Sequence, residues 1–320
     1  MTVPSAAAPT VSLEDIREAA RLLAGVALRT PMVEVAGHPL FLKCEHLQPI
    51  GAFKVRGAHT AIARLAPERR VAGVVTSSSG NHGQAVAWVA ARFGVRSVVV
   101  MPESAPAVKV AGVRRHGGEV VFAGRTRSPE QQVRADHVAA TEGLAQIPPF
   151  DHPDVIAGQG TAGLEILEQA PGVATVLVPV GGGGLLSGIT TAIKALAPGV
   201  EIIGVEPAGA PKLSAALAAG RPATLDQTAS VADGLLTRSI GRLPWVLIEP
   251  HVHRAIAVTD EEIGRAVRYL YERQGLRVEP SGAVTVAAWL AGRVPATGPV
   301  VAVLSGGNVD PELFARMVTG

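Results

Sequence analysis

The sequence predicts an α/β fold with parallel sheets and flanking helices, and three observations support this prediction. Short apolar runs rich in valine and isoleucine alternate with segments of helical pattern. The runs are apolar throughout, as expected for parallel strands that are covered on both faces. Glycine is frequent, with 36 copies, and aromatic residues make up only 3%, which suits many tight turns between strands and helices. Repetition of strand, helix and strand then implies crossover helices.

Eight apolar runs are expected to form strands, and the segments between them read as helices. Two helix starts carry capping-box patterns, Ser12 with Asp15 and Thr259 with Glu262. Gly275 stands where the second of these helices should end. The first nine residues are expected to be disordered. The predicted strands are Leu40–Lys43, Val74–Ser77, Ser97–Met101, Glu119–Phe122, Thr175–Pro179, Glu201–Glu206, Ala255–Val258 and Val300–Leu304.

Composition narrows the class of protein. The chain has 320 residues, of which 48% are hydrophobic, enough for one large domain or two medium ones. A net charge of +2 without a long basic run argues against nucleic-acid binding. No apolar stretch reaches the length of a membrane span, and no leader-like pattern opens the sequence, so a cytoplasmic location is expected. The single cysteine, Cys44, excludes internal disulfides and is expected to be a buried thiol in a strand.

A lysine with apolar neighbours is the first candidate for chemistry. Lys54 lies between Phe53 and Val55, after a strand and a Pro/Gly loop and before an apparent helix. Partial desolvation would lower its pKa and free the amine as a nucleophile, which Schiff-base chemistry requires. The alternative is an ordinary solvated lysine.

A run of serines at a helix start is the second candidate. A predicted strand runs into Ser77, Ser78 and Ser79, which lead through glycine and Asn81 into a helical pattern. Hydroxyls and free N–H groups at a helix N-terminus favour an anion, although a simple serine N-cap is the alternative. His82 follows directly, and a structural role is favoured over a catalytic one because no carboxylate is close in sequence to orient it.

Four consecutive glycines, Gly181–Gly184, join a strand to a helix and form the third candidate. Their unhindered N–H groups can wrap a phosphate. The spacing matches neither G-x-G-x-x-G nor a P-loop, yet a nucleotide site with Glu201 or Glu206 as the ribose-binding acid stays open. Ser305 ends the last strand and adds a hydroxyl at the same kind of strand end. Together the four segments suit an aldehyde cofactor with a phosphate and an amino acid substrate.

With these residues in view, the chain resembles the fold-type II pyridoxal-phosphate enzymes, specifically the serine/threonine dehydratase and serine racemase family. The resemblance runs from about Ser12 to Asp310. It implies a tryptophan synthase β-like architecture, with two open parallel-type sheets and the cofactor in the cleft between domains. Residues 1–66 and 150–320 would form the large cofactor-binding domain, residues 67–149 the small domain, and two chains a homodimer. The matched motifs are Gly51–Ala58, Ser78–Ala85, Val155–Thr161, Val178–Gly184, Ala232–Gly234, Glu279–Ala283 and Leu304–Asp310.

The resemblance also implies roles around pyridoxal 5′-phosphate. Lys54 would form the Schiff base, and Ser79 would stand on the ring face opposite Lys54. The substrate carboxylate would bind backbone N–H and hydroxyl groups of Ser78, Asn81 and His82. The remaining cofactor contacts would be Phe53 near the ring, Asn81 at the phenolic oxygen, Gly181, Gly182, Gly183, Gly184 and Leu185 at the phosphate, Gly234 against the ring, and Ser305 at the pyridine nitrogen.

These roles imply an ammonia-lyase that converts L-threonine or L-serine to a 2-oxo acid and ammonia. A serine at the pyridine nitrogen leaves the ring a weak electron sink, so loss of the β-hydroxyl should be nearly concerted with proton removal by Lys54. Alternatives are a dehydratase for 3-hydroxyaspartate or a bulkier β-hydroxy amino acid, and a serine racemase that uses Lys54 with Ser79. An NAD-dependent dehydrogenase built around the glycines is the remote alternative.

Three departures from the family pattern bear on activity. Ala52 stands where many relatives have serine, which could alter rate or substrate choice. Animal-type relatives bind a divalent cation with a Glu and an Asp; here Glu206 is present, but Lys212 falls at the Asp position, so its ammonium is expected to replace the metal. The substrate-contacting arginine of the racemases is unmatched in the 127–134 region, where Glu130 is nearest, and this favours elimination over racemisation.

Overall fold

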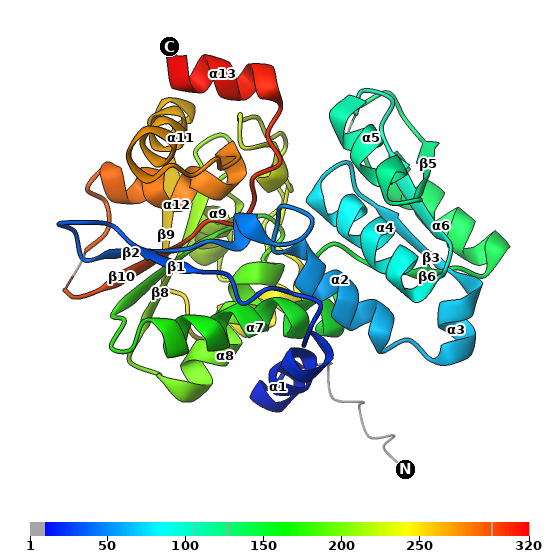
Figure 1. The fold of residues 1–320 in the computed structure, drawn as a ribbon, viewed down its shortest axis with the longest axis horizontal. Helices are drawn as coiled ribbons and strands as arrows, with labels where there is room; N and C mark the ends of the chain where they lie inside the picture. The colour runs from blue at the N-terminus through cyan, green and yellow to red at the C-terminus, as the bar shows by residue number, and fades with distance from the viewer. Residues whose placement is uncertain (1–9, 106, 127, 296, 320) are drawn as a thin grey trace.

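Two sheets form the framework of the protein in a computed structural model that describes residues 10–105, 107–126, 128–295 and 297–319. The larger sheet has the strand order β1-β2-β10-β7-β8-β9 (Figure 1). β1 pairs antiparallel with β2, and the other neighbours pair in parallel. Its strands are β1 (Met32–Glu34), β2 (Leu40–Lys43), β7 (Thr175–Pro179), β8 (Glu201–Pro207), β9 (Arg254–Val258) and β10 (Val300–Val303).

The smaller sheet has the order β5-β4-β3-β6, with all pairs parallel. Its strands are β3 (Val74–Ser77), β4 (Ser97–Met101), β5 (Glu119–Phe122) and β6 (Ala145–Gln146). All eight predicted strands are present within one residue of their predicted bounds, whereas β1 and β6 were not predicted. The expectation that every strand is covered on both faces is wrong for β5, because it lies at the sheet edge and exposes Glu119 and Phe122.

Helices cover both faces of the larger sheet because its side chains alternate between two apolar clusters. Leu177 and Ala302 face one cluster, while the adjacent Val176 and Val301 face the other. The first cluster packs beneath α11 (Asp260–Gln274), α12 (Pro280–Leu290) and α13 (Pro311–Thr319). On the other face lie α7 (Pro153–Gln169), α8 (Gly184–Leu196) and α10 (Arg242–Ile248), with α1 (Leu13–Leu22) packed outside them (Figure 1).

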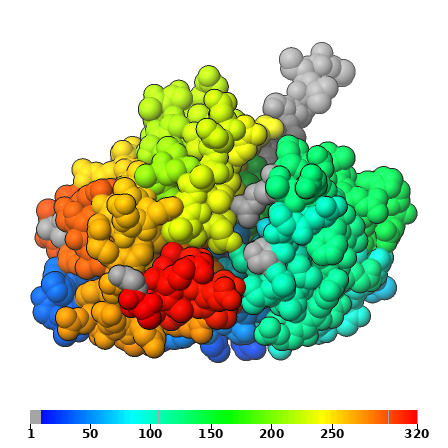
Figure 2. All heavy atoms as spheres, turned by 90° about the horizontal axis from the view of Figure 1, so that it is seen from above, coloured from blue at the N-terminus to red at the C-terminus, as the bar shows by residue number. Residues whose placement is uncertain are grey.

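The smaller sheet is covered in the same way. Val99 packs against α4 (Asn81–Phe93) and α5 (Ala107–Arg115), whereas Val98 and Val100 pack against α6 (Glu130–Glu142). The remaining elements are α2 (Lys54–Ala63), α3 (Pro67–Ala72), α9 (Lys212–Ala219) and the short 3₁₀ helices η1 (Glu45–Leu47) and η2 (Asp233–Leu235). Figure 2 shows the part of the chain that contains the smaller sheet, cyan to green, on one side of the molecule, and later residues, yellow to red, on the other.

Local predictions at the helix ends are confirmed. Both capping boxes form, at Ser12 and at Thr259, and Gly275 ends α11 in the left-handed conformation with φ of 67°. Cys44 is buried as predicted, but it follows β2 instead of lying within it. The disorder predicted for residues 1–9 lies outside the described residues. None of the described helices is both long and apolar enough to cross a bilayer.

The sheets place the predicted functional segments near one another. All strands of the smaller sheet fall between residues 74 and 146, inside the predicted small domain of residues 67–149; the domain boundaries themselves stay predictions. The turns that follow β3, β7 and β10 all leave the carboxyl ends of parallel strands, where ligands of α/β proteins bind. The chain segment before α2 is tied to the end of β10, because Phe53 N donates to Ser305 O at 3.1 Å.

Candidate active site

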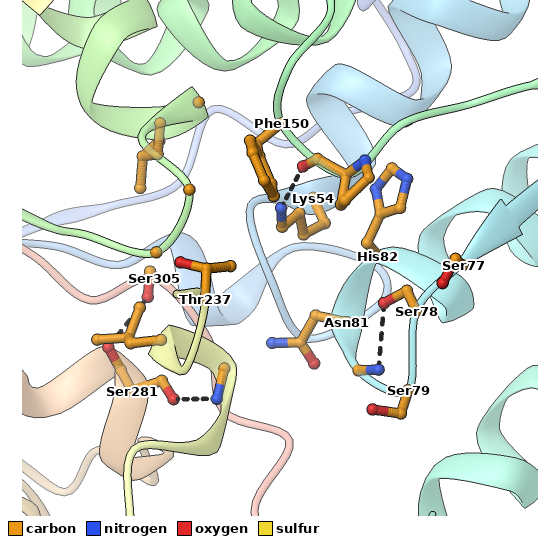
Figure 3. A pocket seen from close by; sticks show the side chains of 18 of the residues that line it. Lys54, Ser77, Ser78, Ser79, Asn81, His82, Phe150, Thr237, Ser281 and Ser305 are labelled. Carbon is orange, nitrogen blue, oxygen red and sulfur yellow. Dashed lines mark hydrogen bonds between the residues drawn. The ribbon is translucent and has the colours of Figure 1, made fainter. Parts of the chain in front are cut away.

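A cavity of about 280 Å³ lies where the predicted segments meet (Figure 3). Its walls come from the start of α2, the β3–α4 loop, the β7–α8 turn, η2 and the residues that follow β10. The predicted cofactor and substrate residues all line it, namely Phe53, Lys54, Ser78, Ser79, Asn81, His82, Gly181, Gly182, Gly183, Gly184, Leu185, Gly234 and Ser305. Glu206 and Lys212 do not line it. Lining residues without a predicted role include Gln131, Phe150, Thr237, Glu279 and Ser281.

Lys54 is the first residue of α2, and its side chain reaches into the cavity. Its Nζ donates to the carbonyl oxygen of Pro149 at 2.6 Å and lies 5.1 Å from the centre of the Phe53 ring. Burial lowers the pKa of Lys54 to about 8. The amine is therefore far easier to deprotonate than that of a surface lysine, as a Schiff-base lysine requires.

A buried ionic network anchors α2 beneath the cavity. Arg56 lies two residues after Lys54 and is almost fully buried. Its guanidinium donates to both carboxylate oxygens of Glu45, each at 2.8 Å, and to those of Glu165 on α7, at 2.7 and 2.8 Å. Bidentate pairs of this kind fix orientation as well as charge, so the start of α2 and with it Lys54 is held in one place.

The β7–α8 turn has the geometry of an anion cradle. Gly183 has φ of 94°, which favours glycine, and a side chain at Gly182 would collide with the Phe150 ring. Helix α8 begins at Gly184, and the N–H groups of its first turn have no acceptor within the helix. Together with the helix dipole, these donors favour a phosphate at this end of the cavity.

The β3–α4 loop offers a second anion site. Helix α4 begins at Asn81, so its first N–H groups also lack acceptors within the helix. The Ser78 hydroxyl accepts from Gly80 N at 3.3 Å (Figure 3), whereas Ser78 N donates to Val100 O and so belongs to the sheet. A substrate carboxylate at this loop would thus meet the Ser78 hydroxyl and helix N–H groups, without the Ser78 N–H.

The His82 ring is anchored to the backbone of the segment that precedes Pro149, the acceptor of Lys54. Its Nε2 lies 2.9 Å from the carbonyl oxygen of Ile147, so that nitrogen carries the proton. Burial, and after it the charge of Lys54, lowers the pKa of His82 to about 3. The ring is therefore neutral and brings no charge to the substrate carboxylate.

Polar groups continue around the opposite wall. Gly234 N donates to the Ser281 hydroxyl at 2.9 Å, and the Ser305 hydroxyl lies 3.5 Å from Ser281 O (Figure 3). Asn81 Nδ2 donates to Glu279 Oε1 at 2.7 Å. Glu279 belongs to the matched motif Glu279–Ala283, but the sequence pattern assigns it no role; the only local signal is its place before a proline at the start of α12.

The structure bears on two expectations from the sequence, the contribution of the 127–134 region to the cavity and the availability of Glu206 to a ribose. In the 127–134 region, Ser128 and Gln131 line the cavity, whereas Glu130 does not. The Gln131 side chain is held by the loop before α6, since its Oε1 accepts from Ser128 N at 2.7 Å and its Nε2 donates to Thr126 O at 3.1 Å. Glu206 accepts from the N–H groups of Leu213 and Ser214, so it is not available to a ribose and the dinucleotide alternative loses that support.

Lys212 lies beside Glu206 in a buried site behind the cavity. Its Nζ donates to the carbonyl oxygens of Ala210 and Leu235, each at 2.9 Å, and lies 3.7 Å from Glu206 Oε2. Burial lowers the pKa of Lys212 to about 8 despite the nearby carboxylate. The replacement of a divalent cation by this ammonium stays a prediction.

The cavity fits pyridoxal 5′-phosphate on these observations. Lys54, whose amine is desolvated, and the anion cradle of the β7–α8 turn line the same space. Two lining residues, His82 and Thr237, carry buried polar atoms without a partner among the described residues, and such atoms in a cavity point to a polar ligand. Lys54 would hold the aldehyde carbon and Gly181–Leu185 the phosphate.

Comparison with known proteins agrees with this assignment. Residues 23–306 match the family model described as pyridoxal-phosphate dependent enzyme. An L-threonine ammonia-lyase of Thermotoga maritima is 41% identical over 96% of this chain and 78% of its own length. An L-threo-3-hydroxyaspartate ammonia-lyase of Saccharomyces cerevisiae is 36% identical over 96% of both chains. The solved structure of maize serine racemase superposes with a TM-score of 0.92 at 37% identity, covering 96% of this chain and 97% of its own. The chain therefore belongs to the pyridoxal-phosphate dependent enzymes of fold type II, within the serine/threonine dehydratase and serine racemase group.

Proposed function

We propose that the protein is an ammonia-lyase that converts L-threonine or L-serine to a 2-oxo acid and ammonia. The observation that carries this proposal is the buried Lys54 amine, which shares one cavity with a glycine turn and with the helix start of the serine loop. This arrangement serves a phosphate-bearing aldehyde and an amino acid carboxylate at the same time. The similarity to an L-threonine ammonia-lyase supports the same reaction class.

Two side chains that line the cavity, Lys54 and Ser305, bear directly on the chemistry of this reaction. Bound pyridoxal 5′-phosphate supplies an electron sink that weakens the Cα–H bond of the substrate. Lys54, with its pKa lowered to about 8, can take the Cα proton at neutral to mildly alkaline pH. Ser305 offers a hydroxyl and no carboxylate, so it does not favour a protonated pyridine nitrogen. A ring with an unprotonated nitrogen is a weaker electron sink, which favours elimination of the β-hydroxyl over a long-lived carbanion.

Charge in the cavity favours threonine or serine over 3-hydroxyaspartate. Among the described lining residues, the basic side chains are Lys54 and the neutral His82. A second substrate carboxylate would therefore find no cation apart from Lys54 among the described lining residues. An unpaired buried carboxylate is costly, so acidic β-substituents should be poor substrates.

Replacing Lys54 tests the proposal. The purified protein is expected to be yellow, and borohydride should attach the chromophore to Lys54, as peptide mass spectrometry would show. Lys54→Ala should lose the visible band and at least about a thousandfold of turnover with threonine or serine, because one residue acts as both anchor and base. A Lys54→Ala variant that kept its colour and activity would exclude the proposed function.

A substrate panel separates the related activities. Release of 2-oxo acid is measured with L- and D-threonine, L- and D-serine and 3-hydroxyaspartate, together with chiral analysis of unreacted serine. Fast release from L-threonine or L-serine supports the proposal. Release mainly from 3-hydroxyaspartate, or D-serine formation without pyruvate, would assign one of the alternatives. The homodimer and the cytoplasmic location stay predictions, which light scattering and cell fractionation would test.

A further inference from the structure

Three polar side chains form a chain of hydrogen bonds along one edge of the cavity. Asn308 Nδ2 donates to the carbonyl oxygen of Ile50 at 2.8 Å and to Asn81 Oδ1 at 2.9 Å. Asn81 Nδ2 in turn donates to Glu279 Oε1 at 2.7 Å. The hydrogen bonds join the segment before Lys54, the segment after β10, the start of α4 and the start of α12. They therefore link the two sheets at the point where Asn81 lines the cavity.

The Ile50 carbonyl determines which group donates and which accepts in each of these hydrogen bonds. A peptide carbonyl only accepts, so Asn308 must turn its NH₂ group toward Ile50. The second hydrogen of that NH₂ group goes to Asn81, which must then present its oxygen to Asn308. The NH₂ group of Asn81 is left facing Glu279 and the cavity. One of its hydrogens serves Glu279, and the other can serve a ligand.

Glu279 alone could not set this direction. Burial, and after it the charge of Asp233, raises the pKa of Glu279 to about 8. A protonated carboxyl both donates and accepts, so it would accommodate either orientation of the Asn81 amide. The two asparagine amides are also closely packed against glycines. A Cβ atom at Gly51 would lie 2.6 Å from Asn308 Oδ1, and one at Gly306 would lie 2.9 Å from Asn81 Nδ2. Both amides therefore have little room to move.

We propose that the Ile50 carbonyl, acting through Asn308, fixes the Asn81 amide as a hydrogen-bond donor toward the phenolic oxygen of bound pyridoxal 5′-phosphate. The inference rests on the proposed function and on the role expected for Asn81. A donor at this place stabilises the phenolate through a charge-assisted hydrogen bond, whereas an amide oxygen would repel it. Asn308 does not line the cavity, so it is a positioning residue that acts through Asn81.

Two substitutions at Asn308 distinguish polarity from packing. Asn308→Asp keeps the shape but replaces the NH₂ group by an acceptor, so the Asn81 amide should turn and present its oxygen to the cofactor. We expect cofactor affinity to fall roughly ten- to a hundredfold and the visible band to move toward the near ultraviolet, as the phenol becomes protonated. Asn308→Ala imposes no polarity and should have the smaller effect. If the residue serves packing alone, the order reverses, because alanine removes more contacts.

The matched control is Thr285→Val, which removes the buried hydrogen bond that Thr285 on α12 donates to Val303 O on β10; neither residue lines the cavity. It should leave the spectrum unchanged. A wild-type protein that takes up no pyridoxal 5′-phosphate would contradict the proposed function itself. A yellow wild-type protein whose Asn308→Asp variant has the same spectrum and affinity would overturn this inference alone.

A measurement without substitution covers the case in which Asn308→Asp does not fold. The sequence contains two asparagines, Asn81 and Asn308, so labelling with ¹⁵N-asparagine yields two side-chain NH₂ signals. Titration with pyridoxal 5′-phosphate should move one Asn81 proton strongly downfield and leave both NH₂ groups of wild type with restricted rotation. An Asn81 NH₂ signal that does not respond to the cofactor would overturn the inference.

Discussion

Glu279 is a carboxyl group whose surroundings oppose its ionisation. Burial is the main cause and the charge of Asp233 the next, and together they raise its pKa to about 8 from the ordinary value of 4.5. Between pH 4.5 and 8, the folded protein therefore keeps this carboxyl protonated, whereas the unfolded chain has already released the proton. Stability from this group is fully present below pH 4.5 and is lost as pH rises through about 8.

Replacing Glu279 by glutamine should remove this dependence. The free energy of unfolding of wild-type apoprotein, relative to Glu279→Gln, is expected to fall with pH by up to about 1.4 kcal/mol per pH unit between pH 4.5 and 8. Urea unfolding of both proteins across this range measures the difference, in which the other titrating groups cancel. Parallel curves for the two proteins would show that Glu279 is ionised in the folded state.

At the level of single residues, the sequence predicts those properties of a side chain that depend on its neighbours along the chain. Lys54 between Phe53 and Val55 suggests a desolvated amine, and in the fold Lys54 is half-buried and desolvation lowers the pKa of its amine to about 8. Glu279 gave no such signal, because its burial comes from Asn81 and Gly306, which are distant in sequence. Gln131 was missed for the same reason: the choice between adjacent residues of α6 depends on which face of the helix meets the cavity.

Among the elements, strands with a strong apolar pattern were predicted and weak ones were not. β6 has two residues, Ala145 and Gln146, and it exists because β3 offers a parallel edge. β1 is short, half-exposed and antiparallel, so its sequence carries no buried-strand pattern. Both receive their backbone partners from segments far along the chain, and such pairing is not contained in a local pattern.

Lys212 connects elements behind the active site, and its removal should loosen them. It starts α9, and its ammonium joins the β8–α9 segment to η2 through the carbonyls of Ala210 and Leu235. Lys212→Met would leave these carbonyls and the Glu206 carboxylate buried without their cation. We expect a loss of about 3–5 kcal/mol in unfolding free energy, measured by chemical denaturation.

The control for this prediction is Ser214→Ala, which removes one donor to Glu206 and should cost about 1 kcal/mol. Because the ammonium is expected to fill the cation position, Mg²⁺ should not raise the melting temperature of wild type. A magnesium-dependent increase, or an octahedral ion beside Glu206 in crystals grown with Mg²⁺, would contradict the replacement of metal by Lys212.

On the scale of the whole molecule, the site is assembled from two sheets that meet around one cavity. Parallel strands place their carboxyl ends at one edge, which is why motifs spread over 250 residues could be expected to converge. The relative placement of the two sheets could not be predicted, since it depends on side chains that cross between them. Asn81 with Glu279 is one such contact, and Lys109 on α5 with Asp233 in η2 is another.

The Lys109–Asp233 ion pair should help hold the cleft closed over the substrate. Asp233 precedes Gly234 of the cavity wall, so separation of the pair would move η2 away from α5. The Asp233 side chain is 46% exposed, so the pair should be worth at most about 1 kcal/mol. Lys109→Asp and Asp233→Lys should each raise KM about two- to fivefold with little change in kcat, while the charge-swapped double variant recovers part of the loss.

Steady-state kinetics on the two single variants and the swap form a double-mutant cycle for this contact. Arg96→Ala is the matched control, because Arg96 pairs with Glu119 and Glu142 within the region of the smaller sheet and does not cross to the larger one. KM should rise with salt in wild type, because salt screens the attraction, and fall with salt in the single variants, because salt screens the repulsion between like charges. If the KM effects of the two single variants simply add in the charge-swapped double variant, the ion pair does not couple the sheets. Closure would then depend on the Asn81–Glu279 contact.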